Sequence, residues 1–248
     1  MVPANNPTSY IIDNYHTLPN ITTFMHGERY QWHNDDPLYD GYEMLSHLQI
    51  PHLLQNGYTN LRCVWTLGCP AELSNLSETP FPGAELKDPK AIENTTLHFP
   101  AAFKELFPGA KLPSTVGVPC CAQFAVTSHK IWERPMEDYV KYRDWLLKTD
   151  LIDHVSGRVF EYSWHIIFGK EPVHCPNAQE CYCKVFGYCD LECGNNSGSA
   201  CGERWPFPPY AGLPSGWPVV GWEGKQRSME ELEEIRMTGV QNNTGNHR

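Results

Sequence analysis

Glu161 and Arg158 are the first residues whose types and spacing could do chemistry. Glu161 lies in an otherwise apolar stretch, residues 157–168, and follows Arg158 by three positions. In a helix this spacing places both charged groups on one face. Burial raises the pKa of a glutamate and a nearby arginine lowers it, and a general base depends on such tuning. We therefore expect Glu161 to be a catalytic base. The alternatives are a structural Arg–Glu pair and an anchor for a neighbouring loop.

A polar segment follows the first predicted strand. Residues 20–26 are β-branched and apolar, which is typical of a buried strand. In α/β sheets, ligands bind just past the carboxyl ends of strands. The segment offers two imidazoles, an indole and two carboxylates: His26, Trp32, His33, Asp35 and Asp36. Because oxygen ligands favour Mg²⁺ or Mn²⁺, we expect Asp35 and Asp36 to hold such an ion, with the two histidines as further ligand candidates. A solvated polar loop is the alternative.

Ten cysteines predict a disulfide framework. They are Cys63, Cys69, Cys120, Cys121, Cys175, Cys181, Cys183, Cys189, Cys193 and Cys201. An even, crowded set is typical of proteins that fold in an oxidising compartment. Buried thiols or a zinc site are the alternatives, although the spacings fit zinc ligands poorly. Because adjacent cysteines do not readily bond each other, we expect Cys120 and Cys121 to reach two different partners.

Glycosylation sequons indicate the same compartment. Five Asn-x-Ser/Thr triplets begin at Asn20, Asn75, Asn94, Asn195 and Asn242. With 15 Asn and 26 Ser and Thr among 248 residues, chance predicts 15 × 26/248, or about 1.6 triplets. The excess predicts N-glycosylation and a place in the secretory pathway, either in the Golgi or outside the cell.

Charge and hydropathy exclude two classes of partner. The net charge is −10 and the chain has no run of Lys and Arg, so nucleic-acid binding is not expected. No apolar stretch approaches 20 residues, so no membrane span is expected in this chain. The first residues also lack the basic and apolar regions of a secretion signal. We therefore expect either a trimmed or incomplete N-terminus that has lost an anchor, or a failure of the compartment assignment.

The patterns predict an α/β core followed by two smaller parts. The core covers residues 1–170 and includes a Pro-rich surface excursion at 66–117. Residues 171–222, rich in Cys, Pro and Trp, are expected to pack on the core as loops and extended chain. Residues 223–248 are expected to form a short acidic helix and a disordered tail. Within the core we expect strands at 20–26, 60–65 and 122–126, and helices at 8–17, 40–49, 101–107, 128–134, 135–148 and 157–168.

Several short motifs occur in a combination that is collectively specific. They are Ile12-Asp13-Asn14-Tyr15, Phe24-Met25-His26-Gly27, Trp32-His33-Asn34, Asn60-Leu61-Arg62, Cys120-Cys121-Ala122-Gln123-Phe124, Ser156-Gly157-Arg158 and Glu161-Tyr162-Ser163-Trp164-His165. Together they resemble a largely fungal family known as domain of unknown function 3431, over about residues 9–190. The general pattern is similar to glycosyltransferases with one Rossmann-like nucleotide-sugar domain.

This resemblance implies a fold, a reaction and residue roles. The fold would be one Rossmann-like α/β domain with a mixed sheet that lacks its first strand, plus a disulfide-rich loop region. A sugar would pass from a nucleotide-sugar donor to a hydroxyl of a glycan or protein acceptor. Glu161 would act as the base, Arg158 would orient it or contact phosphate, and Mn²⁺ or Mg²⁺ would bind Asp35 and Asp36. The implied substrate-binding residues are His26, Trp32, His33, Gln123 and Trp164.

Two other interpretations stay open. The protein could be a non-catalytic, disulfide-stabilised extracellular module that binds glycans or a protein. Such a module would expose tryptophans of residues 205–222 and would need no metal. The chain could also be a truncated and inactive relative, because a missing first strand would remove part of a nucleotide pocket.

Overall fold

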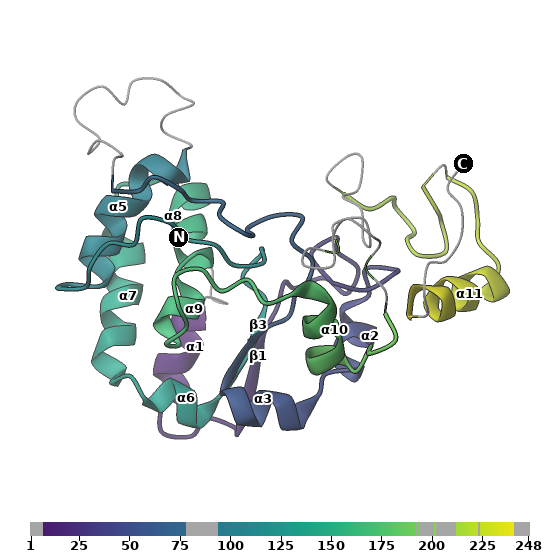
Figure 1. Cartoon of the computed structure of the whole chain (residues 1–248), viewed down its shortest axis with the longest axis horizontal. Helices are drawn as coiled ribbons and strands as arrows, with labels where there is room; N and C mark the ends of the chain where they lie inside the picture. Colours follow the sequence, from purple (N-terminus) through teal and green to yellow (C-terminus); the bar gives the residue numbers. More distant parts are fainter. Residues whose placement is uncertain are drawn as a thin grey trace. The chain divides into compact units, whose positions relative to one another are not determined.

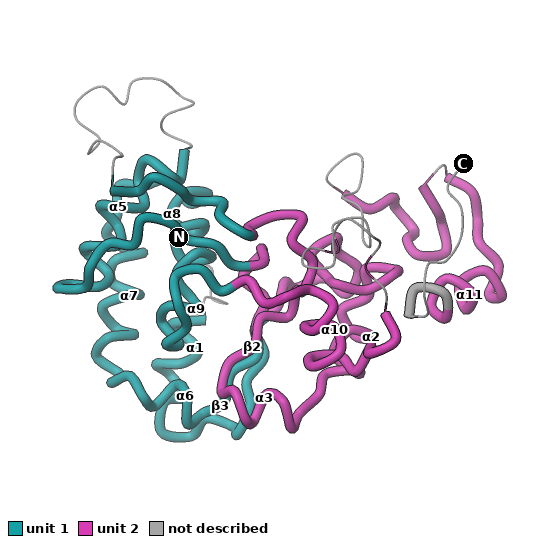
Figure 2. Tube along the Cα trace, in the orientation of Figure 1, with its two compact units in different colours: residues 1–24, 70–118, 125–174 teal, residues 25–69, 119–124, 175–248 magenta. Residues whose placement is uncertain are grey.

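A computed structural model describes residues 7–77, 94–191, 193, 201, 212–222 and 224–240. The chain gathers into two compact units, coloured separately in Figure 2. Unit 1 comprises residues 1–24, 70–118 and 125–174, and unit 2 comprises residues 25–69, 119–124 and 175–248. The predicted parts are continuous in sequence, whereas each unit combines three separate stretches.

Three short strands form one antiparallel sheet in the order β1–β3–β2. They are β1 Ile21–Phe24, β2 Tyr58–Asn60 and β3 Phe124–Thr127. Their β-branched and aromatic residues favour extended chain, and all four residues of β3 are buried. The predicted α/β composition is therefore confirmed, although the strands pair antiparallel where a mixed sheet was expected. The strand predicted at 60–65 ends earlier, because the Asn60 side chain accepts a hydrogen bond from Arg62 N and turns the chain.

Unit 1 is mainly helical (Figure 1). Its helices are α1 Pro7–Asn14, α5 Thr95–Leu106, α6 Ser128–Trp132, α7 Met136–Lys148, α8 Asp153–Glu161 and α9 Trp164–Ile167. Helices α1 and α5 pack on α7, and α5 also packs on α8. The core between them is aromatic, with Phe99, Phe103, Tyr139, Tyr142 and Phe160 buried. These rings supply much of the apolar burial that stabilises this unit.

The helix predicted at 157–168 is two helices. Helix α8 begins at Asp153, four residues before the predicted start, and Ser156 lies buried inside it. The Ser163 hydroxyl then donates to the Val159 carbonyl at 2.6 Å. Hydrogen bonds of this kind compete with the helix ladder and bend or interrupt helices, and α9 starts just after it. Gly169, with φ of +74°, follows α9 and ends the segment.

Unit 2 contains α2 Gly41–Ser46, α3 Ile50–Asn56, α10 Ala178–Phe186 and α11 Met229–Val240. Helix α10 packs on α3. The Cys-rich segment was expected to be loops, but α10 occupies much of its first half. The Asn177 side chain accepts from Glu180 N at the start of α10, and Gly187 ends the helix with φ of +76°. Because these residues cap both ends, the segment forms a helix although its composition is typical of loops.

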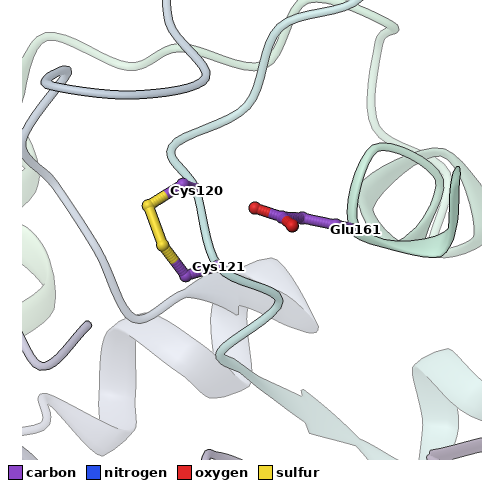
Figure 3. A group of neighbouring side chains, drawn as sticks. All are labelled: Cys120, Cys121 and Glu161. Carbon is purple, nitrogen blue, oxygen red and sulfur yellow. A yellow bond between two sulfur atoms is a disulfide. The ribbon is translucent and has the colours of Figure 1, made fainter. Parts of the chain in front are cut away.

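All ten cysteines are paired, which confirms the disulfide prediction and excludes the zinc alternative. The pairs are Cys63–Cys181, Cys69–Cys175, Cys120–Cys121, Cys183–Cys189 and Cys193–Cys201. Figure 3 draws the bond between Cys120 and Cys121. The expectation that these neighbours reach different partners was wrong. The backbone turns there through positive φ angles, +97° at Cys121 and +54° at Ala122, and accommodates a bond between adjacent residues. Five disulfides are consistent with an oxidising environment.

Candidate ligand-binding site

Residues 25–40 of unit 2 form a loop that its own side chains hold in shape. Oδ1 of Asp36 accepts hydrogen bonds from the N–H groups two and four residues later, at 2.9 and 3.0 Å. Asn34 Nδ2 donates to two carbonyls of the same loop. The Arg29 guanidinium pairs with both oxygens of Asp40 at 2.9 and 2.7 Å, a bidentate geometry. The polar segment that follows β1 is therefore an ordered frame.

Asp35 is a buried carboxylate surrounded by donors. Its Oδ2 accepts from Cys63 N at 2.7 Å, and its Oδ1 accepts from the Tyr182 hydroxyl at 2.7 Å. Burial raises the pKa of Asp35, and the nearby Arg62 and these hydrogen bonds only partly offset that effect. Burial also raises the pKa of Asp36, to about 6.

The predicted metal ligands are therefore engaged by the chain itself. Both Asp35 and Asp36 accept hydrogen bonds from backbone N–H groups. Within the described ranges, neither belongs to a group of three or more converging Asp, Glu, His or Cys side chains. The arrangement does not fit an ion at this pair. The expectation of Mn²⁺ or Mg²⁺ stays a prediction that binding must test.

Three rings of this loop and the guanidinium of Arg62 form a stack. The rings of His26 and His33 lie 4.1 Å apart and nearly parallel, and the ring of Trp32 lies 3.9 Å from that of His33. The Arg62 guanidinium lies over Trp32, 5.2 Å from its ring centre. Burial lowers the pKa of both histidines, to about 3 for His33, where His26 and Arg62 add to the effect. Both imidazoles are therefore neutral at pH 7.

Gln123 ties this stack to the chain beside β2. Its Nε2 donates to the His33 carbonyl at 3.0 Å and to Oδ1 of Asn34 at 3.2 Å, and its Oε1 accepts from His26 N at 3.1 Å. The structure thus brings together four predicted substrate-binding residues: His26, Trp32, His33 and Gln123. Arg62 is buried and was not predicted, because the sequence carries no signal for its contact with Trp32.

A cavity of about 460 Å³ adjoins the stack. Residues 28–33 line one side, with Trp32 and His33 among them, and residues from 212–217 line the rest. Trp217 Nε1 donates to a loop carbonyl, that of Leu38, at 2.6 Å, which orients its indole. Tyr30, Trp32 and Trp217 therefore give the cavity aromatic walls, and its volume suits a small-molecule ligand.

Trp217 was not among the predicted site residues. The clue was the Trp-rich segment 205–222, which the sequence assigned only to the binding-module interpretation. Trp222 packs beside Trp217 with ring centres 4.7 Å apart and is itself exposed. Trp205 lies outside the described residues.

The predicted catalytic pair lies in unit 1, on α8. Arg158 Nη2 donates to Glu72 Oε1 at 2.7 Å and to the Tyr162 hydroxyl at 2.9 Å. Glu161 is the last residue of α8 and is half-buried (Figure 3). Sequence reasoning missed Glu72, because it lies in the stretch interpreted as a surface excursion. The role of Glu161 as a base stays a prediction.

Trp164, the fifth predicted substrate-binding residue, is a core residue of unit 1. Its side chain is buried. Its ring lies 5.4 Å from that of Phe160 and 6.1 Å from that of Phe168. Trp164 does not line the cavity of unit 2.

The described sequons lie at the surface. Asn20, Asn75 and Asn94 are exposed, whereas Asn195 and Asn242 lie outside the described residues. Glycosylation of these sites stays a prediction. In the part of the chain that the structure describes, no helix is both long enough and apolar enough to cross a bilayer.

Comparison with known proteins identifies the family. No curated protein and no solved structure matches the chain. One family model, described as "Protein of unknown function (DUF3431)", matches residues 6–184, well over half of the 248 residues. The match covers the loop that follows β1, the turn at Cys120 and Cys121, and helix α8. The chain therefore belongs to the DUF3431 family.

Proposed function

We propose that this protein binds a sugar-containing ligand in the cavity of unit 2 and acts as a glycosyltransferase of the secretory pathway. The observation that carries the proposal is the lining of the cavity, where Tyr30, Trp32 and Trp217 stand beside the neutral imidazole of His33. Aromatic faces carry negative charge and attract the C–H groups of a sugar ring. The imidazole and the Gln31 side chain supply hydrogen bonds for hydroxyl groups.

The charged groups of the cavity favour a donor that carries phosphate. The Arg29 side chain is half exposed although it pairs with Asp40, so it keeps donors for an anion. A nucleotide diphosphate would place its negative charge there and its rings on the aromatic walls. We include no metal at Asp35 and Asp36 in this proposal, because backbone and hydroxyl donors already engage these carboxylates.

The proposed reaction is a substitution at the anomeric carbon. An acceptor hydroxyl attacks that carbon, a carboxylate base takes the hydroxyl proton, and the bond to the nucleotide diphosphate breaks as the diphosphate leaves with the electron pair. Glu161 is the residue that the sequence predicts for this base. Arg158 holds its place on α8 through Glu72 and so positions charge next to Glu161. The Rossmann-like classification of the fold belongs to this proposal as well.

The proposal is tested by ligand binding to the whole chain. Thermal shifts are measured with UDP- and GDP-sugars, each with Mn²⁺ and with a chelator. At a ligand concentration of about 100 Kd the stabilisation is about 2.7 kcal/mol, a shift of several degrees. Trp32→Leu should remove the shift, whereas Trp132→Leu, at an exposed indole of unit 1, should not. A shift that survives Trp32→Leu, or no shift with any nucleotide sugar, would contradict the donor site.

A second function is favoured by Trp222. This exposed indole extends the aromatic surface beyond Trp217, as expected of a non-catalytic glycan-binding module. Such a module would bind free oligosaccharides and give no response to nucleotides. Calorimetry with neutral oligosaccharides therefore separates the two functions, and Trp222→Ala should weaken binding only in the second.

A further inference from the structure

The bond between Cys120 and Cys121 contributes little to fold stability by chain entropy. A disulfide constrains the unfolded chain more as the loop that it closes lengthens. Cys63 and Cys181 lie 118 positions apart, whereas Cys120 and Cys121 are neighbours. Constraint of the unfolded chain therefore accounts for the first bond but not for the second.

The bond also holds an unfavourable backbone. Residues other than glycine rarely adopt positive φ, yet Cys121 and the following Ala122 both do so, with φ of +97° and +54°. Reduction frees residues 120–122 to leave this conformation. Strained disulfides are the ones that are reduced most readily.

A cation stands next to one of the two sulfurs. Nη1 of Arg62 lies 3.6 Å from Sγ of Cys121. An adjacent guanidinium favours the thiolate over the thiol, and a disulfide breaks faster when the departing sulfur is a stable thiolate. The guanidinium of Arg62 therefore favours attack on Cys120 Sγ, which expels the Cys121 thiolate beside it.

The turn is connected to the cavity wall. Nε2 of His26 lies 3.0 Å from the Cys121 carbonyl, and two residues further on Gln123 donates to the His33 carbonyl. Residues 28–33 form that wall. A backbone change at 120–122 therefore disturbs the contacts that hold the wall in place.

We propose that Cys120–Cys121 is a redox modification site that an external dithiol reduces, and that its reduction loosens residues 26–34. One thiolate of the reagent bonds to Cys120 Sγ and expels Cys121 as a thiolate. The second thiol of the reagent then displaces Cys120. The protein gains two electrons and two protons, and the reagent leaves as a cyclic disulfide. This inference does not rest on the proposed function.

The first experiment titrates the folded chain with mixtures of reduced and oxidised dithiothreitol, followed by alkylation and peptide mass spectrometry. Cys63–Cys181 is the matched control, because it lies in the same unit and is equally buried. Cys120 and Cys121 should become alkylated at a ratio of reduced to oxidised reagent roughly tenfold or more below that for the control. Equal ratios, or reduction only on global unfolding, would overturn the proposal.

The second experiment follows the consequence without any ligand. Hydrogen exchange is compared between the oxidised chain, the chain reduced at this bond, and the Cys120→Ser/Cys121→Ser variant. Exchange should rise several-fold in peptides that cover residues 26–34 and 119–124, and should stay unchanged in α7 of unit 1. If the variant fails to fold, the comparison of the oxidised with the reduced wild-type chain still tests the proposal. Unchanged exchange at 26–34 after confirmed reduction would show that the bond does not control the cavity wall.

Discussion

Oδ1 and Oδ2 of Asp35 satisfy the Tyr182 hydroxyl and Cys63 N inside unit 2. In Asp35→Asn the amide oxygen can still accept from Cys63 N, but the amide nitrogen cannot accept from the Tyr182 hydroxyl, whose proton loses its acceptor. Leaving a buried donor unsatisfied costs about 1–3 kcal/mol, so the free energy of unfolding should fall by about 2 kcal/mol. Urea unfolding measures this loss. Asp190→Asn, at an exposed carboxylate, should change it by less than about 0.5 kcal/mol.

Comparison of the wild type with Asp35→Asn also checks the metal prediction. Unfolding is repeated with and without Mn²⁺. We expect Mn²⁺ to stabilise the wild type and Asp35→Asn by the same amount, because the oxygens of Asp35 already accept hydrogen bonds from the chain. Stabilisation of the wild type alone would restore Asp35 as a ligand.

Glu161→Gln tests the proposed base. The amide keeps the shape of the side chain but cannot accept the proton, so kcat should fall at least about 100-fold. Transfer is measured with the donor that shifts the melting temperature most. Urea unfolding and donor binding should stay as in the wild type. The control is Glu180→Gln on α10, whose exposed carboxylate pairs with Lys184. Retained turnover in Glu161→Gln would end its assignment as the base.

The residue types in the segment after β1 predicted part of the site, but they did not predict Arg62 and Trp217, which complete it. The cluster of His26, Trp32 and His33 was visible because the three lie within eight positions after a strand. Arg62 and Trp217 reach the same place from distant stretches, and a single sequence holds no pattern for such long-range contacts. Asp35 was interpreted as a metal ligand because the sequence does not show that backbone donors surround it.

At the scale of elements, Asn94 has two functions in α5. Its side-chain oxygen accepts from Thr96 N at 3.0 Å and caps the helix, while its amide nitrogen is the predicted glycan attachment point of the sequon Asn94-Thr95-Thr96. Asn94→Ala should lower the free energy of unfolding by about 1 kcal/mol relative to Thr96→Ala, because only the first loses the cap.

Both variants lack the sequon, so a difference between them reports the cap alone. Gel mobility of the secreted chain before and after glycan removal checks glycosylation, and urea unfolding checks the cap. Equal stability of the two variants would show that the cap does not contribute. Equal mobility of the wild type and Thr96→Ala would show that Asn94 is not glycosylated.

Helices and strands were predictable where apolar residues recur with a regular spacing and where capping or turn residues mark the ends. The helix predicted at 135–148 is found as α7, at 136–148, and the strand predicted at 122–126 is found as β3, at 124–127. Helix α10 was missed because its Cys-rich composition masked the capping residues Asn177 and Gly187. Helix α8 was separated from α9 by a side-chain hydrogen bond that periodicity does not register.

At the scale of the whole molecule, the two units should respond differently to acid. Burial lowers the pKa of His165 and His174 in unit 1 to about 4. In the unfolded chain they take up protons below about pH 6.5, so their contribution to stability is complete above that pH and is lost as pH falls toward 4. In unit 2, Asp36 has its pKa raised to about 6, so its contribution to stability is lost as pH rises through 6.

Between pH 7.5 and pH 5.0, His165 alone should lower the free energy of unfolding by about 2 kcal/mol. Urea unfolding at the two pH values measures this change. His165→Gln, whose amide can still donate to the Pro172 carbonyl, should show a smaller pH dependence by about that amount. His129→Gln, at a nearly fully exposed ring, is the surface control. A wild type equally stable at both pH values would contradict the neutral, buried state of His165.

The arrangement of the chain into two units was not predictable from composition. Each unit draws on three stretches, and the boundaries at 24, 69, 118, 124 and 174 fall without a Gly- or Ser-rich linker to mark them. A continuous division at 170 and 222 follows local composition, whereas contacts between distant stretches determine the units.

The two long disulfides have a consequence for synthesis. Cys63 and Cys69 leave the ribosome 118 and 106 residues before their partners, Cys181 and Cys175. At about 5–20 residues per second, they stay as thiols for roughly 5–25 s. Cys120 and Cys121 emerge together during that interval and could bond at once, or be attacked by the two waiting thiols. Unit 2 can be closed covalently only after nearly all of unit 1 has been made, so a ribosome that stalls within residues 125–174 leaves a nascent chain with open thiols for folding factors to recognise.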